Sequence, residues 1–301
     1  MTRKLNLALL ILTLFVGLPF VWLVLDSSVG SATARPISMM QLRRLAASVP
    51  GEPPFELRYE LIGRRSVASD LLAAGSGLRP VPYGIRAYEA VYRNGRVVTI
   101  NRGMSREVAQ QKRVSDFDPE AQAIVEHAVM TAWQRLTLSN DPQHSGQANV
   151  AYDFGSGRKV DRERDADVPY VVTPGVVVIP TDDVAPGKRM VYIRLASDDE
   201  VILAGDVAPV RSSWQELRPP ARLHSIYYST DDREATVGWL LLALCKLKAS
   251  AARLEIVPGH DSFVPRILIH GFTNDPGLRR IAREASGAAA YDAIKRRAMH
   301  R

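Results

Sequence analysis

The hydrophobic pattern of the chain begins with an uninterrupted apolar run. From Leu5 to Leu25 there is no charged residue, and Arg3 and Lys4 stand directly before the run. At about 1.5 Å per residue, a helix of this length crosses a hydrocarbon core of about 30 Å. Positive charge ahead of the span favours a cytoplasmic N-terminus, so that the rest of the chain is exported. The pattern predicts a single-pass inner-membrane protein with its domain on the periplasmic or extracytoplasmic side.

A cleaved signal peptide is the alternative interpretation of the same run. Ala32-Thr33-Ala34 supplies the small residues of a cleavage site. The apolar core of a signal peptide, however, typically spans about 7–15 residues, which is shorter than this run. The length therefore favours a retained anchor. We divide the chain into an anchor or signal segment 1–25, a flexible tether 26–38, a folded domain 39–275 and a basic helical tail 276–301.

The folded domain contains several short strands. Phe55–Leu61 alternates strictly between apolar and polar residues, as a half-buried strand does. Asn94-Gly95 is a strong hairpin signal between two further strands, Tyr88–Arg93 and Val97–Ile100. The remaining strands are expected at Val168–Val172, Val176–Ile179, Met190–Leu195, Val201–Ala204 and Leu254–Val257.

Three helices are expected among these strands. Met39–Val49 is short and is stopped by Pro50, whereas Glu234–Ala249 is strongly apolar. Asp118-Pro119-Glu120 is a helix start, with a capping carboxylate and a proline in the first turn. The apolar stripe of that helix is Ile124, Val125, Ala128, Val129, Ala132 and Leu136. Hairpin-like connections without a regular strand–helix repeat indicate an α/β fold of the α+β type, with two packed sheets and helices outside.

Composition and charge narrow the function classes. With 46% hydrophobic and 24% charged residues, the chain can bury a core. Its single cysteine, Cys245, cannot form an internal disulfide and is expected to be a buried thiol. The net charge is +7, but 39 basic residues are spread among 32 acidic ones without a nucleic-acid motif, so we expect no nucleic-acid partner. The densest basic cluster, Lys295, Arg296, Arg297 and Arg301, would attract anionic lipid heads or form a solvated helix end.

Candidate chemistry lies in three polar loops next to predicted elements. The loops are Ser139–Gly146 after the central helix, Ala204-Gly205-Asp206, and Pro258-Gly259-His260-Asp261. His144, Asp206 and His260 could converge on a metal, because neutral imidazole and carboxylate suit zinc or iron. Each signal is weak alone, since a lone histidine or a Gly-Asp turn is usually structural.

The order and the sequences of these segments resemble those of the metallo-β-lactamase-fold hydrolases, especially their membrane-anchored, lactonase-like branch. The resemblance runs from about residue 40 to about residue 265 and is specific after residue 168. It rests on the strand-rich stretch from Val171 to Asp206, followed by Ile256-Val257-Pro258-Gly259-His260-Asp261. It implies an αββα sandwich of two mixed sheets with outer helices and a site along one edge of the sheets.

The family's metal motifs are only partly present here. In its His-x-His-x-Asp-His run, the four motif positions are held by Ser139, Asp141, Gln143 and His144. The ligand histidine of its second motif is replaced by Val184 within Asp183–Gly187, and Asn101 stands in the N-terminal turn. Asp206 and His260 match the family pattern. The resemblance thus implies that one of two metal sites has lost its imidazoles, while His144, Asp206 and His260, with Gln143 as a further neutral ligand, could hold one ion.

Two functions follow from this ligand set. The first is a non-catalytic or weakly active domain that keeps the fold, has a depleted metal centre and binds a small molecule or protein at the membrane. The second is a mononuclear zinc-dependent hydrolase of an ester or lactone, with Asp141 as the candidate general base. The cofactor is accordingly one zinc or other divalent ion, or none. A third interpretation is that the three turns are unrelated and the resemblance is misleading.

Overall fold

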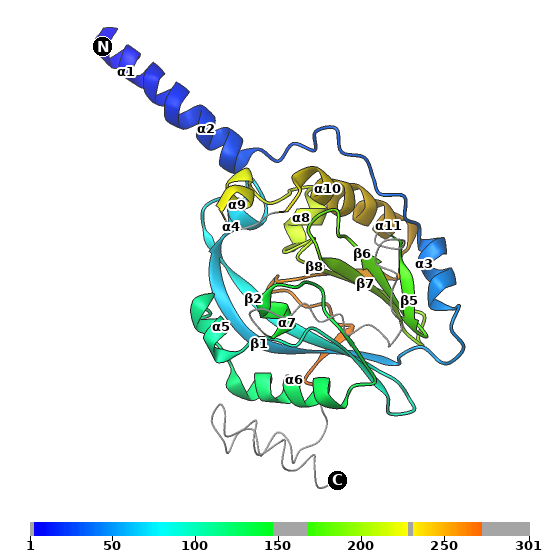
Figure 1. Ribbon diagram of the computed structural model, residues 1–301. Coiled ribbons are helices and arrows are strands. Elements are labelled where there is room, and N and C mark those ends of the chain that lie inside the picture. Colours follow the sequence, from blue (N-terminus) through cyan, green and yellow to red (C-terminus); the bar gives the residue numbers. More distant parts are fainter. Residues whose placement is uncertain (1–2, 147–167, 228–230, 273–301) are drawn as a thin grey trace.

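The computed structural model describes residues 3–146, 168–227 and 231–272. Within these ranges the chain forms two five-stranded sheets lying face to face, with helices on both outer sides (Figure 1). The expected αββα sandwich is confirmed. The basic tail expected at 276–301 lies outside the described residues.

The first sheet is built around one long antiparallel pair. Its strands, in spatial order, are β10 (Leu268–His270), β1 (Glu56–Ala68), β2 (Pro80–Val91), β3 (Val97–Ile100) and β4 (Gln134–Leu136). The hairpin at Asn94-Gly95 joins β2 to β3 as predicted. The edge strands β10 and β4 run parallel to β1 and β3, respectively, so the sheet is mixed.

The second sheet contains the five strands expected between residues 168 and 258. In spatial order they are β5 (Tyr170–Thr173), β6 (Val176–Pro180), β7 (Arg189–Arg194), β8 (Glu200–Gly205) and β9 (Leu254–Pro258). The first four pair antiparallel, whereas β8 and β9 run parallel. Because β8 and β9 point the same way, their carboxyl ends meet at one edge of the sheet.

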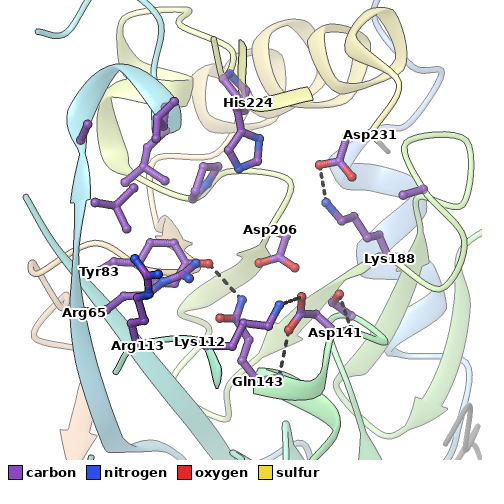
Figure 2. Close-up of a pocket in the computed structure, with 18 of the residues that line it drawn as sticks. Arg65, Tyr83, Lys112, Arg113, Asp141, Gln143, Lys188, Asp206, His224 and Asp231 are labelled. Carbon is purple, nitrogen blue, oxygen red and sulfur yellow. Dashed lines mark hydrogen bonds and ion pairs between the residues drawn. The ribbon is translucent and has the colours of Figure 1, made fainter. Parts of the chain in front are cut away.

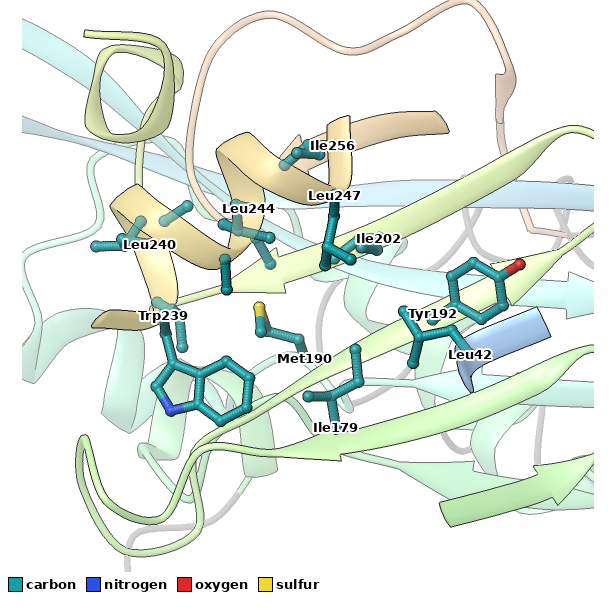
Figure 3. Packing of buried hydrophobic residues seen from close by; sticks show 14 of the residues in the cluster. Leu42, Ile179, Met190, Tyr192, Ile202, Trp239, Leu240, Leu244, Leu247 and Ile256 are labelled. Atoms are coloured by element: carbon teal, nitrogen blue, oxygen red, sulfur yellow. The ribbon is translucent and has the colours of Figure 1, made fainter. Parts of the chain in front are cut away.

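Alternating residues of the second sheet fill two separate cores. Val176, Val178 and Val191 face the first sheet, while Val177, Ile179 and Tyr192 face outward against helices. The outer layer there consists of α3 (Met39–Ala46) and one continuous helix made of α10 (Arg233–Val237), η3 (Gly238–Ala243) and α11 (Leu244–Ser250). Figure 3 shows Trp239, Leu240, Leu244 and Leu247 packing on this face of the sheet.

The opposite face of the first sheet is covered by α5 (Arg106–Gln111) and α6 (Pro119–Thr131). The Asp118 side chain accepts from the backbone N–H groups of Glu120 and Ala121, so the predicted helix start is confirmed. Four further short helices lie in the domain: α4 (Ser69–Leu72), α7 (Pro142–Ser145), α8 (Arg211–Gln215) and α9 (Arg222–Tyr227).

One element boundary expected from the sequence is wrong. The apolar stripe predicted to run through Ala132 and Leu136 leaves the helix at Ala132, whose ψ of 141° is extended. Leu136 belongs instead to β4 and pairs with Ile100 of β3. Hydrogen bonding to an existing strand thus overrides a helical spacing of apolar residues.

Cys245 is only partly buried, and its thiol donates to the Trp214 carbonyl oxygen.

The N-terminal residues form one helix that extends away from the domain (Figure 1). It comprises α1 (Arg3–Leu12), η1 (Thr13–Gly17), α2 (Leu18–Phe20) and η2 (Val21–Leu25). The helix has 23 residues, and its most apolar 18-residue window has a mean hydropathy of 2.6 and is only 6% buried. By length and composition it is able to cross a membrane. A signal sequence near the N-terminus meets the same criteria of length and composition.

The segment after this helix, expected to be a flexible tether, lies against the domain. Val29, Ala32 and Ile37 pack on the outer core of the second sheet. Arg35 forms an ion pair with Asp183, and its backbone N–H donates to the Gly238 carbonyl. Residues 26–38 therefore contribute to the packing of the domain.

Candidate metal centre

The three expected ligands meet where the carboxyl ends of β8 and β9 approach α7. Gly205 pairs with Pro258 at the end of the parallel strands, which places Asp206 and His260 on adjacent turns. The strand ends lie so close that a Cβ atom on Gly259 would be 2.5 Å from the Gly205 carbonyl oxygen. Only glycine allows this approach, because a real Cβ does not come so near to an oxygen.

His144 is held at the same edge by α7. Asp141 caps this helix by accepting from the Gln143 N–H, Pro142 occupies its first turn, and Gly146 ends it with a φ of 80°. The His144 carbonyl then accepts from the Arg102 N–H at 2.7 Å, which ties the turn after β3 to α7. Residues 139–146, which follow β4, therefore form a short, braced ligand loop.

Both imidazoles face the same carboxylate oxygen. His260 Nε2 lies 2.7 Å and His144 Nε2 lies 3.1 Å from Asp206 Oδ1. The three ligand atoms all lie within 4.8 Å of one another. Metal–nitrogen bonds near 2 Å mean that ligands of one tetrahedral ion are roughly 3.4 Å apart. Two imidazoles and a carboxylate are thus close enough together to be the ligands of a single ion.

The surroundings of His260 select its metal-binding tautomer. The side chain is fully buried and stacks on the Tyr83 ring with 3.7 Å between centroids. Its Nδ1 lies 2.8 Å from the Gly84 carbonyl oxygen, while the Gly84 N–H donates to the His260 carbonyl. Donation from Nδ1 to Gly84 leaves the Nε2 lone pair directed at Asp206.

Hydrogen-bond counting at His260 tests whether a cation fits between the ring and Asp206. Burial lowers the pKa of His260 to about 4, so the ring is neutral and carries one proton. Its two nitrogens nevertheless face two acceptors, the Gly84 carbonyl and the Asp206 carboxylate. One lone pair is therefore opposed to an oxygen at hydrogen-bond distance unless positive charge lies between them. The donor set fits a bound metal ion.

Asp206 connects this buried pair to solvent. Its side chain is 14% exposed and lines the cleft, whereas the two histidines lie behind it. Burial alone would raise the pKa of Asp206, but the charge and hydrogen bond of His144, the hydrogen bond of His260 and the charge of Lys188 hold that pKa well below its usual range. The carboxylate is therefore ionised and available as a ligand.

Four further residues that the resemblance singled out have structural contacts. Asp141 Oδ2 accepts from Lys112 Nζ at 2.8 Å, and its Oδ1 caps α7. Gln143 donates to the Tyr83 hydroxyl at 3.0 Å, and its buried Oε1 has no hydrogen-bond partner among the described residues. The Ser139 hydroxyl accepts from the Asp141 N–H. Val184 is 2% exposed within the outer core of the second sheet.

A cleft of about 1070 Å³ opens in front of Asp206 (Figure 2). Four of its lining side chains are cationic and three are anionic. Lys112 pairs with Asp141, and Lys188 pairs with Asp231 at 2.5 Å. The charged lining residues are Arg65, Lys112, Arg113, Lys188, Asp141, Asp206 and Asp231. The cleft is large enough for a small-molecule ligand.

Tyr83 is a site residue that sequence reasoning missed. It lies on β2, its hydroxyl oxygen accepts from Gln143, and the Arg65 guanidinium lies 4.3 Å from its ring centroid. Burial first, and then the charge of Asp206, raises the pKa of Tyr83, so the phenol keeps its proton. A tyrosine within Pro80–Val91 has no local signal for function, because only the packing of β2 against the turn after β9 brings it to His260.

Comparisons with known proteins agree with this geometry at the level of the fold. No protein-family model and no curated protein matches the chain. A solved N-acyl homoserine lactone hydrolase with N-hexanoyl-L-homoserine bound at its catalytic metal center is similar, with a TM-score of 0.51, 14% identity, and 70% of this chain and 94% of that chain covered. A variant of B. thuringiensis AiiA with N-decanoyl-L-homoserine at its active site gives a TM-score of 0.50 at 15% identity, with the same coverage. The chain is therefore built on the metallo-β-lactamase fold of these lactone hydrolases.

Proposed function

We propose that the chain is a membrane-anchored hydrolase that holds one divalent metal ion through His144, Asp206 and His260 and cleaves an ester or lactone. The observation that carries this proposal is the convergence of two imidazole nitrogens on one carboxylate oxygen at the floor of an open cleft. Three protein ligands and one open position are typical of catalytic zinc, whereas structural zinc usually has four protein ligands.

The side chains around the cleft have distinct roles in this reaction. The ion, when bound, would lower the pKa of water and polarise the substrate carbonyl. Asp206 supplies the only solvent-facing ligand of the three, so it orients the reacting groups. The Tyr83 hydroxyl accepts from Gln143 and can donate its own proton to an oxygen that gains negative charge. Asp141 lines the same cleft and is the candidate base for the proton of water.

A second metal ion is not part of the proposal. The positions where the family would place its other ligands are held by Ser139, by Asp141 paired with Lys112, and by Val184 in the core. Valine has no lone pair to donate. This depletion favours a second candidate function, a non-catalytic domain that binds a small molecule or protein in the cleft.

Metal content tests the proposed site. We expect the purified full-length chain to contain about one zinc or similar ion per molecule, and His260→Ala to lose it. His270→Ala is the matched control, because His270 is 61% exposed on β10 and remote from the ligands. Stoichiometric metal in His260→Ala, or none in the parent after loading with zinc, manganese or iron, would overturn the proposal. Metal bound without turnover of aryl esters or lactones would favour the non-catalytic candidate.

The retained anchor is part of the same proposal. Cleavage after Ala34 would remove Val24, which is 6% exposed, and Asp26, which pairs with Arg222. A segment that contributes contacts to the folded domain is expected to stay attached to it. Intact mass of the membrane-extracted protein should therefore include residues 1–34. A mass beginning at Arg35 would show that the segment is a signal peptide.

A further inference from the structure

The last turn of the N-terminal helix is docked on the domain. Asp26 accepts from the Arg222 guanidinium at 2.7 and 3.1 Å, and its carbonyl accepts from Arg233 at 2.8 Å. The Gly75 N–H donates to the Val24 carbonyl. The Arg222 guanidinium also lies 5.3 Å from the Trp22 ring centroid. These contacts fix the direction in which the helix leaves the domain.

The elements that hold the helix also form one wall of the cleft. η2 contacts α4 and α9 (Figure 1). Leu71 and Leu72 of α4 and Ile226 of α9 line the cleft in front of Asp206. His224 of α9 projects into the same cleft in Figure 2. The helix end and the cleft mouth therefore share two short helices.

Exposed apolar side chains lie at this end of the domain. Ile226 is 60% exposed and Leu78, in the turn after α4, is 63% exposed beside the exposed Arg79. Trp22, 56% exposed near the helix end, is the kind of residue that marks a membrane interface. Large apolar side chains next to arginines suit the boundary between lipid tails and head groups.

We infer that the cleft takes its substrate from the membrane: an amphiphile whose acyl ester or lactone enters past α4 and α9 while its apolar tail stays in the outer leaflet. This rests on the proposed hydrolase function and its retained anchor. Water adds to the carbonyl carbon, the acyl–oxygen bond breaks, and the leaving oxygen takes up a proton. An ester gives an acid and an alcohol, and a lactone gives one hydroxy acid. A docked helix places the cleft mouth beside the bilayer, where the local concentration of such a substrate is highest.

An insertion that frees the helix tests this substrate route. A flexible Gly/Ser segment of about eight residues is placed between Leu25 and Asp26. It leaves the Asp26–Arg222 pair on the domain and releases Trp22 and Val24 from their contacts with Arg222 and Gly75. The matched control carries the same insertion between Gly30 and Ser31, so that Trp22, Val24 and Asp26 keep their contacts with the domain; a Cβ on Gly30 would meet nothing within 4 Å. Both variants and the parent, in vesicles, are given a long-chain fluorogenic acyl ester in the bilayer and a short-chain water-soluble ester with the same reporter.

We expect the Leu25/Asp26 insertion to hydrolyse the bilayer ester about tenfold more slowly than the control, with equal rates on the soluble ester. If the two insertion variants hydrolyse each ester at the same rate, the inference is overturned, while the hydrolase function stands. If the parent itself hydrolyses neither ester, the hydrolase function is overturned instead.

A measurement independent of activity locates the cleft mouth. In a Cys245→Ser background, a fluorophore is attached at Ile226→Cys or, as control, at Asn94→Cys. β2 begins near α4 and its twelve residues carry the chain roughly 40 Å to the hairpin at Asn94. We expect head-group-labelled quencher lipids to quench the label at 226 and to leave the label at 94 unchanged. Equal quenching at both positions, or none at 226, would show that the mouth does not face the membrane.

Discussion

The hydroxyl of Tyr83 is enclosed by groups that keep it protonated and directed. Gln143 donates to its oxygen, and its ring stacks on His260. Tyr83→Phe should keep the stack and the metal ligands and remove only the proton donor. We expect metal content to be unchanged and kcat to fall by about 100-fold, as when one oxyanion donor is lost. A kcat equal to that of the parent would exclude a role for this hydroxyl in the reaction.

Glu89 is a second residue whose pKa is shifted. It lies on β2, remote from the candidate metal site. It is 7% exposed, and burial raises the pKa of its carboxyl to about 7. Arg58 opposes this shift, whereas Glu60 and Glu56 add to it. The folded state therefore binds a proton more tightly than the unfolded state, and this contribution to stability is lost as pH rises from about 4.5 to about 7.

Glu89→Gln should remove this pH dependence, because the amide does not ionise. We expect the free energy of unfolding at pH 8 to exceed that of the parent by up to about 3 kcal/mol, and the two proteins to be similar at pH 4.5. Urea titrations of the detergent-solubilised protein at both pH values measure the difference. If the difference in the free energy of unfolding between variant and parent is the same at pH 4.5 and pH 8, the expectation is contradicted.

At the scale of elements, the site depends on how closely β8 and β9 approach. Gly259→Ala places a methyl group against the Gly205 backbone, which has no room to give. We expect the turn carrying His260 to move away from Asp206, with metal affinity reduced about tenfold or more although no ligand is changed. Gly95→Ala is the control: its φ of 79° strains the hairpin, but no atom lies within 4 Å of the new Cβ. Equal zinc affinity in the two variants would contradict the expectation.

Most strands were predictable because their pattern is local. Val176–Ile179, for example, is a continuous apolar run buried on both faces, and the Asn94-Gly95 turn defines its own hairpin. β10 was not predicted, because three residues form a strand only by pairing with β1 about two hundred positions earlier in the chain. Leu136 was assigned to the wrong element for the same reason.

The candidate ligands could be predicted from the sequence, but the hydrogen bonds and ion pairs that hold them in place could not. His144, Asp206 and His260 each stand next to a turn signal, and the resemblance set their order. Nothing local indicates that Gly84 accepts from His260, or that Lys112 pairs with Asp141. These contacts join segments far apart in the chain, so they depend on the assembled sandwich.

For the whole molecule, the segment before residue 39 is expected to contribute to stability, because it packs against the domain. A domain beginning at Ile37 lacks Val24, Val29 and Ala32, which cover the outer core and the α4–α9 surface. We expect its free energy of unfolding to be about 2 kcal/mol lower than that of a domain beginning at Leu23, since burying one valine contributes a comparable amount. Urea denaturation of the two proteins compares them. Equal stability would show that these contacts are not maintained in solution.

The burial of Val184 makes a second metal site difficult to introduce here. An imidazole at this position would have to displace apolar neighbours, and it would gain nothing while Ser139 and Asp141 remain as they are. Each change toward a paired centre is costly alone and useful only with the other two. Mutation and selection acting one step at a time would therefore seldom introduce a second ion into this scaffold.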